Sequence, residues 1–201
     1  MRIILASQSP RRKKLLHQLG FRFEIIPSSV VEESEESDPK EFVKELAFKK
    51  ASQIASLNPD SLVIGSDTIV VLENKILGKP TDNSEAFEML SSLSGTQHFV
   101  YTGVSLIETN QKAEQIKKVI FCTSTKVTFS ALDPGEIRQY IQTGSCLDKA
   151  GSYGIQDDWG ATFVESIEGD FYNVVGLPLN RLYFELKSHF PETLNEISIS
   201  V

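Results

Sequence analysis

Residues 3–20 read IILASQSPRRKKLLHQLG, and this stretch predicts a buried strand, a polar loop and a helix in succession. Its opening β-branched run is typical of a strand buried on both faces. Ser9 is a favourable helix N-cap, Pro10 suits the first helical position, and Gly20 is expected to end the helix. A strand that leads into a helix in this way is the first half of an α/β unit.

The rest of the chain continues this alternation and then turns to longer strands. The pattern predicts strands at residues 21–26, 97–107, 118–132 and 163–167, helices at 38–54, 84–93, 133–141 and 179–189, and loops at 27–39 and 169–178. Residues 62–72 (LVIGSDTIVVL) predict two strand segments that meet at the polar insert 65–68. The order of elements predicts an α/β fold: a mixed twisted sheet with flanking helices.

Length and composition limit the classes of protein that remain. The 201 residues suit one domain, 1–201, and the net charge of −7 argues against binding to a nucleic acid polymer. The sequence contains neither an apolar run of about 18 residues that could cross a membrane nor the apolar segment of a signal peptide. Cys122 and Cys146 are too few for a disulfide framework and are expected to be reduced, buried thiols. A cytoplasmic protein with no membrane partner is therefore expected.

Two ionisable residues lie where apolar residues are expected. Asp67 interrupts the apolar stretch 62–72, where a carboxylate must be paired, hydrogen-bonded or metal-bound, or else cap a turn at a strand end. Lys50 falls on the apolar stripe of the second helix, from which it can either snorkel to water or direct its ammonium at an anion. Lys49 lies off that stripe and is expected to be solvated.

Other basic residues have the setting of a phosphate site. Arg11 and Arg12 occupy the first turn of a helix, where cations are disfavoured unless an anion joins them, although a basic surface run is the alternative. Lys79 in Gly-Lys-Pro and Lys149 in Lys-Ala-Gly lie in loops that suit either a phosphate contact or a plain turn. The three histidines show no zinc-binding spacing, so carboxylate oxygens and Mg²⁺ or Mn²⁺ fit the chain better.

Five motifs together resemble the Maf family, the septum-formation-inhibitor-like nucleotide pyrophosphatases. They are ASQSPRR (6–12), SDT (66–68), GKP (78–80), KAGSYGIQ (149–156) and GDFYNVVGLP (169–178). The resemblance implies hydrolysis of a nucleoside triphosphate to the monophosphate and pyrophosphate with a divalent cation, Mg²⁺ or Mn²⁺. It also implies the fold shared with inosine-triphosphate pyrophosphatases, with a central cleft, and a homodimer.

The resemblance also assigns roles to single residues. It implies catalytic roles for Asp67, as proton acceptor, and for Lys50 and Glu32, with Asp67 and Glu32 beside the metal. The substrate-binding positions that it implies are Ser7, Arg11, Arg12, Thr68, Lys79 and Gln156. The family's Asp-Glu-Ser reads Glu32-Glu33-Ser34 here, so Glu33 is an alternative to Glu32.

The paired arginines and the KAGSYGIQ run are similar to the family branch that acts on dTTP and UTP. The leading hypothesis is therefore a dTTP/UTP pyrophosphatase in nucleotide-pool sanitation, or house-cleaning. Modified pyrimidine nucleotides are further candidate substrates under this hypothesis. The alternatives are a non-catalytic nucleotide-binding regulator of cell division and the same chemistry on purine or 7-methyl-GTP substrates.

Overall fold

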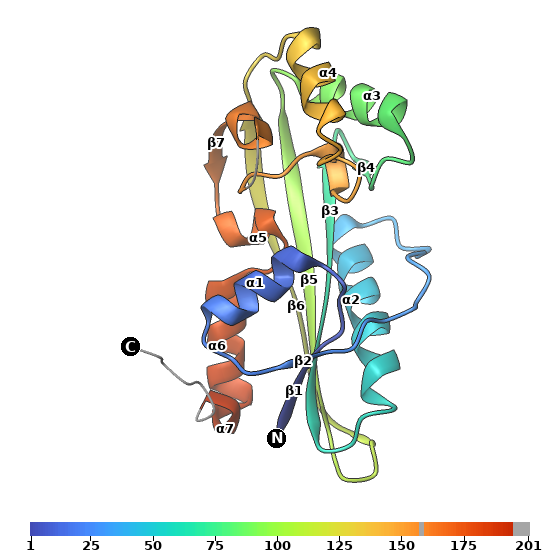
Figure 1. Ribbon diagram of the computed structural model, residues 1–201. Coiled ribbons are helices and arrows are strands. Elements are labelled where there is room, and N and C mark those ends of the chain that lie inside the picture. The colour runs from blue at the N-terminus through green and yellow to red at the C-terminus, as the bar shows by residue number, and fades with distance from the viewer. Residues whose placement is uncertain (157–158, 195–201) are drawn as a thin grey trace. The chain divides into compact units, whose positions relative to one another are not determined.

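The computed structural model describes residues 1–156 and 159–194. Within them, seven strands form one mixed sheet in the order β2-β1-β3-β5-β6-β7, with β4 paired to β3. The strands are β1 (Arg2–Leu5), β2 (Glu24–Ile25), β3 (Ser61–Leu72), β4 (Lys75–Leu77), β5 (Gln97–Thr109), β6 (Gln115–Phe129) and β7 (Val164–Glu168). The helices are α1 (Pro10–Gln18), α2 (Pro39–Ala55), α3 (Asn83–Leu93), α4 (Pro134–Gln142), α5 (Phe171–Val175), α6 (Leu179–His189) and α7 (Pro191–Leu194), as Figure 1 shows.

The strand directions confirm the prediction of a mixed α/β sheet. β1 is parallel to β2 and to β3, whereas the β3–β4 and β6–β7 pairs are antiparallel. β5 and β6 are neighbours joined by a short turn, in which the amide of Asn110 donates to the carbonyl of Glu114 at 3.0 Å. The fold therefore combines a parallel strand-helix-strand start with a long hairpin. Among the described residues, no helix is long and apolar enough to span a membrane.

The chain divides into two compact units, each assembled from separate stretches. Of the described residues, the first comprises 1–67, 102–123 and 176–194, and the second comprises 68–101, 124–156 and 159–175. Three strands, β3, β5 and β6, contribute residues to both units. The prediction of one domain spanning 1–201 stays a prediction.

In the first unit, helix α2 packs closely on the strands. Its apolar face joins β1 and β3 in a core of Ile4, Ala6, Ala51, Ile54, Ala55, Val63 and Ile107. A Cβ built at Gly65 would lie 2.4 Å from the carbonyl oxygen of Ala47, and one at Gly103 would lie 2.2 Å from that of Val43. Glycine at these two positions lets the backbone of α2 approach the sheet, which brings the polar residues on its inner face to β3.

The second unit has its own core, in which aromatic rings surround a buried histidine. His98 is 1% exposed, and its Nε2 lies 2.7 Å from the hydroxyl of Tyr153. The ring of Phe129 meets both edge to face. Burial lowers the pKa of His98 to about 4, so this imidazole is neutral at physiological pH.

Three predicted elements differ in the structure. Residues 62–72 form part of one continuous strand, β3, because the polar groups of the insert find partners and need no break. The strand predicted at 21–26 is limited to two exposed residues at the edge of the sheet. The loop predicted at 169–178 contains helix α5, where the Asp170 carboxylate accepts from the amide of Tyr172 at 2.8 Å.

Candidate active site

Helix α2 presents Lys50 on its buried face. The helix begins where the Asp38 carboxylate accepts hydrogen bonds from the amides of Lys40 and Glu41, with Pro39 in the first helical position. Lys50 is only 7% exposed, like the apolar residues of the same stripe. The sequence left snorkelling and anion contact open for this residue, and its burial excludes snorkelling as the main arrangement.

Lys50 joins two carboxylates from other segments of the first unit. Its Nζ lies 2.6 Å from Oδ1 of Asp67 on β3 and 2.7 Å from Oε1 of Glu32 in the loop before α2. The Asp67 side chain is 8% exposed, whereas the Glu32 side chain is 48% exposed. The ion pair compensates the buried Asp67 charge, which would otherwise be strongly unfavourable. Asp67 is thus part of an ionic cluster and not the cap of a turn.

The geometry also separates Glu32 from its alternative, Glu33. The Glu32 carboxylate contacts Lys50, while Glu33 offers its backbone carbonyl to Nζ of Lys49 at 3.1 Å. Lys49, expected to be solvated, is therefore in contact with this loop. Of the two glutamates, Glu32 is the one that contacts the Lys50–Asp67 pair.

Arg12 is held at the start of α1 by two oxygen acceptors. Its Nε donates to the carbonyl of Gly176 at 2.9 Å, and its Nη1 donates to Oγ of Ser7 at 3.2 Å. The hydroxyl of Ser66 on β3 donates to the same Gly176 carbonyl at 3.2 Å. Gly176 has a φ of 120°, a conformation that favours glycine. This carbonyl therefore connects α1, β3 and the start of the final segment of the first unit.

The charges around Arg12 link it to the Lys50 cluster. Burial is the main cause that lowers the pKa of the Arg12 guanidinium. The negative charges of Asp67 and Glu32 oppose this shift, and the positive charge of Arg11 adds to it. An arginine remains cationic at neutral pH despite such a shift. Arg11 and Arg12 are partly buried, whereas Lys13 and Lys14 are exposed, so the surface-run interpretation applies to the two lysines only. Cations and carboxylates thus meet within the first unit.

The remaining predicted site residues, Thr68, Lys79 and Gln156, belong to the second unit. There the amide of Gly151 donates to the carbonyl of Gly78 at 3.0 Å, which joins the loop of Lys79 to the loop that leads to Gln156. A Cβ at Gly78 would meet nothing within 4 Å, so the packing of the protein does not require glycine there. That these three residues act together with the first-unit cluster stays a prediction.

Lys149, in the second unit, is also 7% exposed, but its partners are local. Its Nζ donates to the carbonyl and the hydroxyl of Ser145 and pairs with Asp148 at 2.9 Å. Lys149 therefore stabilises the loop to which it belongs. Cys122 and Cys146 are free thiols as predicted, although only Cys146 is fully buried.

The first-unit cluster offers two carboxylate donors of the kind that a hard divalent cation binds. Two carboxylate oxygens, from Glu32 and Asp67, are directed at one point that the Lys50 ammonium now occupies. Residues 1–156 and 159–194 contain no group of three or more His, Cys, Asp or Glu side chains that could hold a metal ion. Because Mg²⁺ commonly binds through one or two carboxylates together with substrate phosphates, the pair fits such an ion.

Two features of this site were missed by sequence reasoning. The Gly176 carbonyl received no role, although the GDFYNVVGLP motif pointed to its position. The contacts that Lys49 and its neighbours on α2 make with the Glu32 loop carry no signal in the sequence, because polar residues on an exposed helix face are ordinary.

Several known proteins are similar to this chain. The family model described as "Maf-like protein" matches residues 2–189. A "dTTP/UTP pyrophosphatase" from Thermoanaerobacter sp. is 49% identical over 94% of this chain and 97% of its own length. One from Bacillus cereus is 52% identical over 92% of this chain and 94% of its own. A solved nucleoside-triphosphatase / dITP/XTP pyrophosphatase from Mycobacterium abscessus aligns with 66% of this chain and 76% of its own at 16% identity and a TM-score of 0.40.

Proposed function

Because the chain belongs to the Maf family, we propose that it is a nucleoside triphosphate pyrophosphatase that hydrolyses dTTP and UTP. Water attacks the α-phosphorus, the bond between the α-phosphorus and the bridging oxygen breaks, and the products are the monophosphate, pyrophosphate and a proton. Relatives named for this activity, 49% and 52% identical, support the substrate class. The support for the reaction is the cluster around Lys50.

The single observation that carries the proposal is the position of Lys50 between two carboxylates. Its Nζ lies 2.6 Å from Asp67 and 2.7 Å from Glu32. A triphosphate brings about four negative charges, which local cations must neutralise in a chain of net charge −7. Lys50 and the arginines of α1 supply such cations, and Asp67 supplies a buried carboxylate that accepts the proton of the attacking water.

A divalent cation is proposed as cofactor, held by Glu32 and Asp67. When bound, Mg²⁺ or Mn²⁺ would neutralise phosphate charge and lower the pKa of a coordinated water. The protein contributes the remaining parts. Arg11 and Arg12 contact phosphate oxygens at the helix N-terminus, with Ser7 beside them, and stabilise the charge of the leaving pyrophosphate.

Residues of the second unit are proposed to recognise the nucleoside and the outer phosphates. Gln156 carries both an amide donor and an acceptor, which suits the edge of a pyrimidine. Lys79, exposed in its loop, supplies a further phosphate contact, and Thr68 follows Asp67 directly in β3. The proposal includes action in the cytoplasm, where nucleoside triphosphate pools and reduced thiols are found, and a homodimer.

The test is a panel of nucleoside triphosphates with the purified protein and Mg²⁺ or Mn²⁺. The panel contains dTTP, UTP, modified pyrimidine nucleotides, purine nucleotides and 7-methyl-GTP, and pyrophosphate release is measured. In ¹⁸O-water the account predicts label in the monophosphate, because attack occurs at the α-phosphorus. Release from purine or 7-methyl-GTP substrates alone would overturn the substrate class. No release from any triphosphate would overturn the enzymatic function and favour a nucleotide-binding regulator.

A further inference from the structure

Glu32 lies in an acidic loop that has no regular secondary structure. The loop from residue 26 to residue 38 has no helix or strand, and the Glu32 side chain is 48% exposed. Four more carboxylates, Glu33, Glu35, Glu36 and Asp38, lie in the same loop and repel one another. Ordering such a segment costs conformational entropy. Favourable contacts between the loop and the rest of the unit must offset this cost if Glu32 is to stay at Lys50.

On the N-terminal side of Glu32, one glutamine of α2 makes these contacts. Oε1 of Gln53 accepts from the hydroxyl of Ser28 at 2.7 Å and from the amide of Ser29 at 2.9 Å. Nε2 of Gln53 donates to the hydroxyl of Ser29 at 2.9 Å. A single side chain thus fixes two consecutive loop residues through both ends of its amide.

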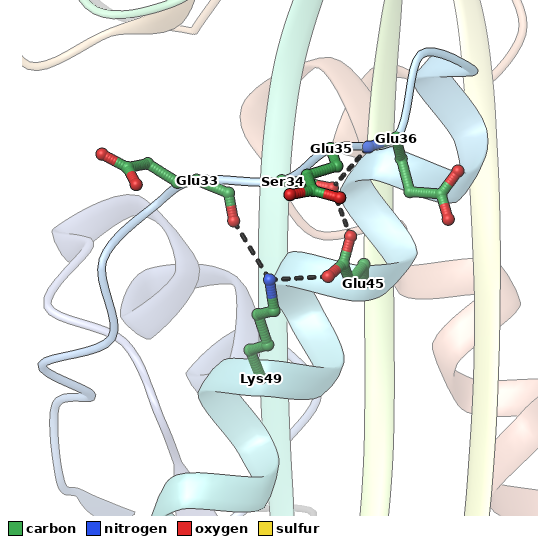
Figure 2. Close-up of a pocket in the computed structure, with 6 residues that line it drawn as sticks. All are labelled: Glu33, Ser34, Glu35, Glu36, Glu45 and Lys49. Atoms are coloured by element: carbon green, nitrogen blue, oxygen red, sulfur yellow. Dashed lines mark hydrogen bonds and ion pairs between the residues drawn. The ribbon is translucent and has the colours of Figure 1, made fainter.

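On the C-terminal side, an ion pair of α2 does the same. Figure 2 shows Lys49 and Glu45 beneath the loop. Nζ of Lys49 donates to the carbonyl of Glu33 at 3.1 Å and pairs with Glu45 at 2.6 Å, while the hydroxyl of Ser34 donates to the same Glu45 carboxylate. These residues line an open, largely acidic pocket with Glu35 and Glu36. The loop is therefore fixed immediately after Glu32.

The three helix residues form one row. Glu45, Lys49 and Gln53 are spaced four residues apart, which places them on successive turns of the same face, and Lys50 follows Lys49 directly. We propose that this row, the α2 clamp, positions Glu32 for metal binding by holding the loop on both sides of it. The proposal rests on the proposed function, because it assumes that Glu32 binds the divalent cation; the clamp residues are positioning residues.

The test uses Lys49→Ala, Gln53→Ala and the double variant, with Lys49→Arg as the conservative variant that keeps a donor. Lys44→Ala is the matched control, since Lys44 belongs to the same helix and pairs with Glu41 at 2.6 Å. The first readout is amide hydrogen exchange in residues 28–36, which needs no activity. Because each lost hydrogen bond weakens local stability, we expect exchange about fivefold faster in either alanine variant and little change in Lys44→Ala and Lys49→Arg.

The second readout is the Mn²⁺ concentration for half-maximal pyrophosphate release, measured in parallel with Mn²⁺ affinity by calorimetry. We expect that concentration and the dissociation constant to rise about five- to tenfold in the alanine variants, with kcat at saturating metal within about twofold. In a Glu32→Gln background the same substitutions should cause no further change in either of these two Mn²⁺ values, because the clamp affects metal binding through Glu32.

Unchanged loop exchange in the double variant would overturn the clamp, as would a further loss of the same size in the Glu32→Gln background. If wild-type protein releases no pyrophosphate but binds Mn²⁺, the proposed function fails, while exchange and Mn²⁺ affinity still decide the clamp. If metal affinity is unaffected although exchange rises, the loop is held by the clamp but Glu32 is not positioned by it for metal, and the proposal is wrong.

Discussion

Lys50 and Lys149 have the same burial and opposite roles in the structure. Each is 7% exposed, and each directs its ammonium at oxygen atoms. The partners of Lys50 are two carboxylates that lie 17 and 18 residues away in sequence, whereas those of Lys149 lie within four residues. A buried cation therefore marks a candidate site when distant segments supply its partners, and marks a closed loop when the partners are local.

The largest effect is expected at the carboxylate that Lys50 holds. Asp67→Asn keeps the shape of the side chain but removes the group that we propose as proton acceptor and metal ligand, so we expect about 10²- to 10⁴-fold slower pyrophosphate release from dTTP. Steady-state kinetics measure the loss, and circular dichroism checks that the variant is folded. Near-normal turnover in a folded variant would assign the proton transfer to another group.

The second prediction compares the two lysines through stability. Lys50→Met leaves the buried Asp67 carboxylate without this partner and is expected to lower the free energy of unfolding by about 3–5 kcal/mol. Lys149→Met removes local hydrogen bonds and is expected to lower it by about 1–3 kcal/mol. Urea unfolding measures both.

A double substitution checks the cause. Lys50→Met combined with Asp67→Asn should recover part of the loss, because the buried group is then neutral. If the loss of stability in the double variant equals the sum of the losses in the two single variants, the ion pair between Lys50 and Asp67 is not the cause of the instability.

The third prediction concerns the hydrogen-bonded pair of His98 and Tyr153 in the second unit. His98 has a pKa of about 4 in the folded protein and about 6.5 when unfolded. The unfolded state therefore binds more protons between these values, so stability is fully present above pH 6.5 and declines as the pH falls towards 4, by about 3 kcal/mol in total. His98→Gln, which keeps a partner for Tyr153, should flatten this part of the profile. An unchanged slope would place the acid sensitivity elsewhere.

The last stability prediction, similar in size to that for Lys149→Met, tests how α2 brings Lys50 to β3. Gly65→Ala places a methyl group 2.4 Å from the carbonyl oxygen of Ala47, where backbone must move, and is expected to cost about 1–3 kcal/mol of stability. Gly78→Ala is the control, since a Cβ there meets nothing within 4 Å. Equal unfolding midpoints for the two variants would contradict the close approach of helix and strand.

The sequence revealed the charged residues of the cluster better than their surroundings. Asp67 and Lys50 break apolar patterns, and this violation is visible without any structure. Gln53 and Glu45 obey the pattern of an exposed helix face, so nothing in the sequence separates them from solvated residues. Their role depends on where the loop before α2 returns, which is a tertiary feature.

The secondary structure could be predicted where a local pattern in the sequence determines it, and not where tertiary contacts do. Helix α6 was predicted with its observed bounds, because its apolar periodicity extends over three turns. Helix α5 was missed, since five residues are too short to show a period. The break predicted within residues 62–72 is wrong, because polar residues can continue a strand when they have partners: Ser66 donates to the carbonyl of Gly176, and Asp67 pairs with Lys50.

The most direct measurement is the rate of pyrophosphate release from dTTP at saturating Mg²⁺ by wild type, Lys50→Met and Lys149→Met. The account predicts release by wild type, a loss of about 10²-fold or more in folded Lys50→Met, and a loss of less than about tenfold in Lys149→Met. An equal loss in the two folded variants, or no release by wild type, would contradict it.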